Sequence, residues 1–140
     1  MLAQLFFEDY DSQKASGYFY SRLQNPTNDM VAAKIAEMEG GTAAMLTSSG
    51  QAANFFALFN ICECGDHIVA SSSIYGGTFN LIDVTMRKMG IDVTFVSPDA
   101  TEEELNEAFK PNTKVMFGET IANPALTVLD IELFAKVAHA

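Results

Sequence analysis

The chain has 140 residues, of which 49% are apolar, and a formal net charge of −10 at pH 7. This apolar share is enough for a folded core and excludes a disordered polymer. The acidic charge excludes nucleic-acid binding, which needs clustered Lys and Arg, and means that any phosphate ligand must be held by local contacts.

No apolar run approaches the length of a membrane span, and the chain begins without the basic residues that open a signal peptide. We therefore expect a cytoplasmic protein without a membrane partner, in which Cys62 and Cys64 are free thiols. His67 lies near them in the sequence, but a structural metal site needs further ligands, so we expect no metal.

Residues 1–27 are predicted to form an irregular N-terminal arm, interrupted by Gly17 and Asn25-Pro26. Helices are predicted at 28–39, 51–61, 78–89, 101–109 and from 130 onward, and strands at 42–47, 67–70, 93–96 and 114–117. This alternation predicts a three-layer α/β fold, a mainly parallel sheet with helices on both faces. Because no stop signal closes the last predicted helix, residues 28–140 are expected to be the first, incomplete part of a larger domain.

The first predicted helix has an apolar face of Val31, Ile35 and Met38. Its start is assigned to a cap at Thr27 or Asn28. Its end is assigned to the glycines that follow residue 39, because glycine adopts the left-handed conformation that closes a helix.

The other helices carry further signals. The helix at 51–61 is apolar almost all round, which predicts that it is covered on most sides. Thr101 and Glu104 form a capping box, and Asp130 caps the last helix. No Gly, Asn or Pro closes that last helix, so we expect the fold to continue into another strand.

A possible anion site follows the strand predicted at 42–47. Ser49, Gly50 and Gln51 open a helix there, and backbone N–H groups at a helix start bind anions. The glycine would allow a phosphate to approach closely. An ordinary turn with a serine cap explains the same residues, and the pattern is not a Walker loop.

Polar residues also follow two other predicted strands. Tyr75 precedes two glycines and would be able to stack on a planar ring, or simply cover the sheet edge. Glu119 directly follows an apolar strand, and Asn123 precedes a proline that favours extended geometry. Each of these is open to a plainer explanation, a solvated loop charge or an Asn-Pro turn.

The arm contains Arg22, one of only two arginines, with Tyr20 beside it. Arginine binds phosphate through a two-pronged donor set, although a lone surface arginine is the commoner case.

Together and in this order, these segments resemble one enzyme family. The segments are Tyr20-Ser-Arg22-x-x-Asn-Pro-Thr27, Glu39-Gly-Gly, Ser49-Gly50-x-Ala, Tyr75-Gly-Gly-Thr and Glu119-Thr-x-x-Asn123-Pro124. They are similar to the Cys/Met-metabolism family of pyridoxal-phosphate (PLP) enzymes, from about Leu5 to the last residue.

The resemblance implies roles for these residues. Ser49, Gly50 and Gln51 match the turn that binds the PLP phosphate, and Tyr75 matches the tyrosine that stacks on the ring. Glu119 and Asn123 match the acid and the amide near that ring, which makes Tyr75 and Glu119 the expected catalytic residues.

Tyr20 and Arg22 match a pair that reaches the phosphate held by a neighbouring subunit. The resemblance thus implies a homo-oligomer, typically a tetramer made of two dimers. It also implies an amino-acid substrate and, through PLP, replacement or loss of the group on Cγ.

Within the family, Tyr75-Gly-Gly-Thr-Phe-Asn80 resembles the branch that replaces the acetoxy group of O-acetylhomoserine with sulfide or a thiol, forming homocysteine or methionine. The alternatives are methionine γ-lyases, which carry cysteine at the position of Gly77, and cystathionine γ-synthases or lyases, which often carry arginine at that of Asn80.

The family's aspartate beside the pyridinium nitrogen and its covalently bound lysine match no residue here, so we expect the 140 residues alone to be inactive. An alternative of another class is a non-catalytic module that binds a phosphate ligand or serves assembly.

Overall fold

The structure is a computed structural model, and it describes residues 7–9, 14–15, 17–18 and 20–140. The chain divides into two compact units, Met1–Thr47 and Ser48–Ala140. The predicted division into an arm of residues 1–27 and a domain from residue 28 remains a prediction about the whole protein.

In the first unit, strands β1 (Phe7–Asp9) and β2 (Lys14–Ala15) pair antiparallel within the segment expected to be irregular. Helix α1 (Pro26–Glu39) begins two residues earlier than predicted, because Asn25 is its cap instead of Thr27 or Asn28. The Asn25 side-chain oxygen accepts from both of those backbone N–H groups, at 3.0 and 3.4 Å. Asn is a strong cap, and proline is well suited to the first helical position.

Gly40 ends α1 as predicted, with a left-handed φ of 66°. The apolar face of α1 is largely exposed, at 37% for Val31, 42% for Ile35 and 75% for Met38. One expectation for this unit is wrong. Residues 42–47 are not a strand, and Met45 is 72% exposed. An apolar run forms a strand only where a neighbouring strand completes its hydrogen-bond ladder, and the parallel sheet here consists of three later strands.

That sheet forms the centre of the second unit. Strand β3 (His67–Ser71) lies between β4 (Asp92–Val96) and β5 (Thr113–Phe117), and both neighbours run parallel to it. All five residues of β3 are buried, as expected for a strand covered on both faces.

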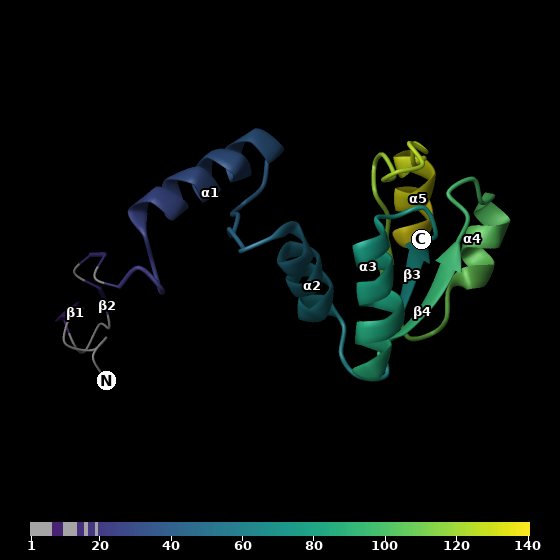
Figure 1. Cartoon of the computed structure of the whole chain (residues 1–140), viewed down its shortest axis with the longest axis horizontal. Helices are drawn as coiled ribbons and strands as arrows, with labels where there is room; N and C mark the ends of the chain where they lie inside the picture. Colours follow the sequence, from purple (N-terminus) through teal and green to yellow (C-terminus); the bar gives the residue numbers. More distant parts are fainter. Residues whose placement is uncertain (1–6, 10–13, 16, 19) are drawn as a thin grey trace. The chain divides into compact units, whose positions relative to one another are not determined.

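Successive β3 side chains point to opposite faces, and each face has its own core. Ile68 belongs to the cluster formed with α2 (Gly50–Ile61) and the π-helical turn η2 (Leu81–Met86), which continues α3 (Gly76–Asn80). Val69 belongs to the cluster formed with α4 (Glu102–Ala108) and α5 (Ile131–Ala138). Figure 1 shows α3 and α4 on opposite sides of β3 and β4. The predicted α/β fold with helices on both faces is confirmed.

The helix starts in this unit follow the sequence signals closely. The Thr101–Glu104 capping box is present, with bonds of 2.8 and 3.3 Å, and Asp130 caps α5. Helix α2 differs from expectation, because Leu58 is its only buried residue while Phe56, Phe59 and Ile61 are about half exposed. Within the described chain α2 is covered on one side only. No described helix is both long and apolar enough to cross a membrane.

His67 ties the three strands together. Its ring is fully buried, with Nδ1 2.7 Å from the Thr113 hydroxyl and Nε2 2.9 Å from the Thr94 hydroxyl. The Thr113 hydroxyl also accepts from the Lys110 N–H at 2.8 Å, so the same hydroxyl holds the turn that precedes β5. Burial lowers the pKa of His67, and the Lys110 charge lowers it further.

This burial predicts a pH-dependent stability. The unfolded chain takes up the imidazole proton first as pH falls, so the free energy of unfolding should decrease below about pH 6.5. In denaturant titrations at several pH values, His67→Gln should flatten this decrease. The exposed His139 is the matched control, and an equal flattening in His139→Gln would contradict the assignment.

Gly90 offers a second stability test. Its φ is +82°, and an added Cβ would lie 2.5 Å from the Cys64 sulfur. Gly90→Ala should lower the free energy of unfolding by about 1–2 kcal/mol, the cost of a left-handed conformation for a residue with a Cβ. Gly76→Ala is the control, because it adds its Cβ in open space without a positive φ. Equal stability of the two variants in urea titrations would overturn this reading.

Candidate functional site

The carboxyl ends of β3 and β5 place two of the predicted site residues in contact. Parallel strands end at the same edge of a sheet, where ligands of open α/β folds bind. Tyr75 follows β3, Glu119 follows β5, and the Tyr75 backbone N–H donates to Glu119 Oε1 at 3.0 Å. A bond across 44 residues of sequence therefore fixes the loop that presents the tyrosine.

The ring of Tyr75 is 48% exposed and lies close against the backbone of Gly77. A Cβ at Gly77 would be 2.5 Å from Tyr75 Cε1, so a side chain at that position would displace the ring. A partly exposed ring, fixed in this way, has a free surface on which a planar group can stack.

The start of α2 has the features of an anion site. Ser49 is the cap, and its Oγ accepts from the Ala52 N–H at 3.1 Å. The first N–H groups of a helix have no intrahelical acceptor, so those of Gly50 and Gln51 are available to an anion. Among the described residues, no heavy atom beyond the chain neighbours of Gly50 and the backbone of its own helix lies within 4 Å of a Cβ built on Gly50, which leaves space for close approach.

The side chain of Gln51 has a different partner. Its amide donates to the Thr78 hydroxyl at 3.1 Å, which directs the side chain toward α3 and leaves the backbone N–H of Gln51 as the donor at the helix start. Asn54, one turn further along α2, donates to the same hydroxyl at 3.1 Å. The sequence reading assigned no role to Thr78 or Asn54, although Thr78 belongs to the Tyr-Gly-Gly-Thr segment.

Asn123 is exposed and follows Glu119 on a loop with a cis peptide bond to Pro124. The loop is closed by the Ala122 N–H, which donates to the Thr127 carbonyl at 2.9 Å. In the described part of the chain, the Asn123 amide makes no hydrogen bond to Tyr75 or Glu119.

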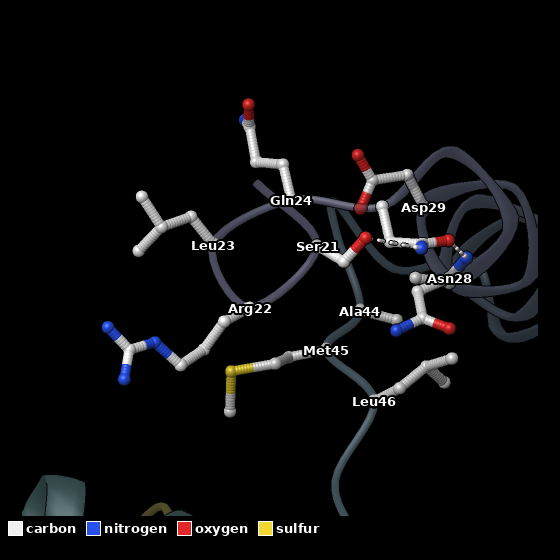
Figure 2. Close-up of a pocket in the computed structure, with 11 residues that line it drawn as sticks. Ser21, Arg22, Leu23, Gln24, Asn28, Asp29, Ala44, Met45 and Leu46 are labelled. Carbon is white, nitrogen blue, oxygen red and sulfur yellow. Dashed lines mark hydrogen bonds between the residues drawn. The ribbon is translucent and has the colours of Figure 1, made fainter. Parts of the chain in front are cut away.

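Tyr20 and Arg22 belong to the first unit, and they contact each other. The Arg22 guanidinium carbon lies 5.0 Å from the centroid of the Tyr20 ring, a cation–π geometry. Figure 2 shows Arg22 extending away from Ser21 and Asn28, beside a cavity of about 290 Å³. Both side chains are exposed, and their guanidinium and ring remain open to a partner.

The cysteines are both free, with Cys62 buried and Cys64 exposed. Burial raises the pKa of the Cys62 thiol, which keeps it protonated and unreactive. In the part of the chain that the structure describes, no three His, Cys, Asp or Glu side chains are grouped as a metal site would require.

A phosphorylated planar group fits this edge of the sheet. The open glycine and free N–H groups of α2 suit a phosphate, and the exposed Tyr75 ring suits a flat partner. The second unit thus has the architecture of the open α/β folds, in which ligands bind beyond the carboxyl ends of the strands.

The chain belongs to the Cys/Met metabolism PLP-dependent enzyme family, whose family model matches residues 3–140. It is 50% identical over 123 residues to an O-acetyl-L-homoserine sulfhydrylase of Corynebacterium glutamicum, covering 88% of this chain and 28% of that protein. It is 44% identical to an L-methionine gamma-lyase of Fusobacterium nucleatum, covering 89% of this chain and 31% of that protein.

Among solved structures, a putative O-acetylhomoserine (thiol)-lyase of Campylobacter jejuni superposes with a TM-score of 0.82 at 35% identity. The match covers 99% of this chain and 32% of that one. The chain therefore spans less than a third of the length of each of these relatives.

The contact between Tyr75 and Glu119 can be tested at a single amide. Glu119→Ala removes the acceptor, so the Tyr75 N–H should exchange with solvent severalfold faster in NMR hydrogen-exchange measurements. Glu119→Gln keeps a carbonyl oxygen at the same place and should retain most of the protection. Unchanged exchange in Glu119→Ala would contradict the contact.

Proposed function

We propose that this chain supplies the phosphate-binding and ring-stacking part of a PLP enzyme. The enzyme replaces the acetoxy group of O-acetylhomoserine with sulfide or a thiol, giving homocysteine or methionine. The observation that carries the proposal is the juxtaposition of Tyr75 with Glu119 and of Gln51 with Thr78, which joins the predicted site segments in the second unit. The 50% identity to a sulfhydrylase supports the substrate.

When bound, PLP supplies the electron sink for chemistry at the carbons of the amino-acid substrate. In this proposal the N–H groups of Gly50 and Gln51 hold the phosphate, and the Ser49 cap fixes the turn that presents them. Tyr75 stacks on the ring and excludes water from its covered face. Glu119 holds the Tyr75 loop, and Asn123 is assigned to the ring's edge.

The assembly is part of the same proposal. Tyr20 and Arg22 are assigned to the phosphate of a neighbouring subunit, in a cytoplasmic homotetramer made of two dimers. Their exposed, mutually contacting side chains support this assignment, because a guanidinium that is already oriented by a ring loses less freedom on binding phosphate.

Elimination from methionine is the second candidate, since methionine gamma-lyases are 44% identical to this chain. Gly77 favours the replacement reaction, because the resemblance implies cysteine at this position in the lyases. In this chain a Cβ at position 77 would lie 2.5 Å from Tyr75 Cε1, so the observed position of the Tyr75 ring suits glycine. The cystathionine enzymes are a further alternative.

An activity assay separates the sulfhydrylase from the lyase. In an enzyme containing these residues, the assay compares homocysteine formation from O-acetylhomoserine with methanethiol release from methionine.

A role in assembly without catalysis is the candidate of another class. The half-exposed Phe56, Phe59 and Ile61 of α2 favour it, because exposed apolar side chains gathered on one helix are typical of contact surfaces. Failure to bind PLP, together with self-association in solution, would support this role.

The phosphate turn predicts a difference between PLP and pyridoxal, which lacks the phosphate. In fluorescence titrations the chain should bind PLP at least about tenfold more tightly, the contribution of one or two charge-assisted hydrogen bonds. Gly50→Val should remove this preference by filling the open space, while Gly41→Ala in the first unit should retain it. Equal affinities for PLP and pyridoxal in the unmodified chain would contradict the proposed site.

The 140 residues alone are predicted to give no turnover, because the covalent lysine and the aspartate of the family match none of their residues. Borohydride reduction with PLP, followed by digestion, should yield no single stoichiometrically labelled lysine. One fully labelled lysine together with turnover of O-acetylhomoserine would refute this prediction.

A further inference from the structure

Thr78 is the buried polar group at the junction of α2 and α3. Its side chain is completely buried. Its hydroxyl oxygen accepts two hydrogen bonds from α2, one from the Gln51 side-chain amide and one from that of Asn54, both at 3.1 Å. The two donors are three residues apart and therefore lie on the same face of the helix. One hydroxyl thus fixes both the position and the rotation of the first turn of α2.

The same hydroxyl is linked to the Tyr75 loop. Thr78 lies in the first turn of α3, and the loop enters that helix through Tyr75. The Gln51 amide nitrogen also lies 3.1 Å from the point where a Gly77 Cβ would be. The Gln51 amide therefore occupies the space between the two helix starts, and only a glycine at position 77 leaves room for it beside the Tyr75 ring.

We propose that Thr78 is a positioning residue, whose hydroxyl holds the phosphate-binding turn of α2 at a fixed distance from the Tyr75 ring. This inference rests on the proposed function, in which the turn and the ring bind two ends of one rigid ligand. A rigid ligand requires a fixed separation, and a shift of about 1 Å is enough to lose much of the binding.

The proposal requires a hydroxyl group at position 78, and a side chain of the same size without a hydroxyl does not suffice. Valine has nearly the volume of threonine but leaves the two amides without their acceptor in a partly buried place. The amides would then turn toward water, and the first turn of α2 would lose its attachment to α3. Serine keeps the acceptor and removes only a methyl group.

The test compares Thr78→Val with Thr78→Ser and with Thr94→Val as a matched control. Thr94 also carries a partly buried hydroxyl bonded to another element, the His67 ring, but it lies in β4. Amide exchange is measured at Ala52 and Ala53, whose N–H groups bond to Ser49 in the first turn of α2. PLP and pyridoxal affinities are measured on the same samples.

Thr78→Val should accelerate exchange at Ala52 and Ala53 by at least about fivefold, the effect of losing one to two net hydrogen bonds. It should also reduce the preference for PLP over pyridoxal, whereas Thr78→Ser should restore both properties. Thr94→Val should leave both at the unmodified values.

Two results would overturn the proposal: unchanged exchange in Thr78→Val, or equal acceleration in Thr78→Val and Thr94→Val, which indicates general loosening. The exchange experiment needs no ligand. If the unmodified chain binds no PLP, the proposed function fails, while exchange at Ala52 and Ala53 still decides whether Thr78 fixes this turn.

Discussion

The structure of the second unit depends on the burial of one short strand from both sides. Every residue of β3 is buried, with Ile68 in the core formed with α2 and η2 and Val69 in the core formed with α4 and α5. Burial of these five residues on two faces removes their backbone groups from water, so the hydrogen bonds to both neighbouring strands must be complete. β4 and β5 supply those ladders, and both must run parallel because helical crossovers connect the strands.

The same constraint places the site. In a parallel sheet the loops after β3 and β5 emerge at one edge, and this is where Tyr75 and Glu119 form their bond. The buried His67, at the opposite end of β3, forms hydrogen bonds with a threonine hydroxyl on each neighbouring strand. One end of the strand is therefore fixed by a saturated internal network, while the other carries the groups that remain open to a ligand.

Local sequence signals predicted the parts of the fold that local chemistry determines. The Thr101–Glu104 box, the Asp130 cap and the Gly40 stop are formed by residues a few positions apart, and all three are present. The strand expected at 42–47 and the covered α2 depend on neighbours far away in the sequence, and periodicity carries no information about whether such neighbours exist. The cap at Asn25 was missed because Pro26 was read as a boundary instead of a first helical residue.

In the candidate site, too, the sequence predicted residue identities but not the contacts between segments that are far apart in the chain. Residue type and order indicated Ser49, Gly50, Tyr75 and Glu119, but not the hydrogen bonds that orient them. Thr78 was overlooked because its role comes from two amides on another helix. Asn123 matches the family pattern but makes no hydrogen bond to Tyr75 or Glu119 within the described residues, and Tyr20 and Arg22 belong to the first unit, so the roles of these three residues are proposals.

The central claim is that the first turn of α2 holds the phosphate of PLP. A titration followed by ¹H–¹⁵N correlation spectra tests it most directly, with PLP added to the labelled chain and inorganic phosphate as competitor. The account predicts that the largest shifts occur at the Gly50 and Gln51 amides, and that phosphate competes with PLP for them. Shifts confined to residues around lysines, with Gly50 and Gln51 unchanged, would contradict it.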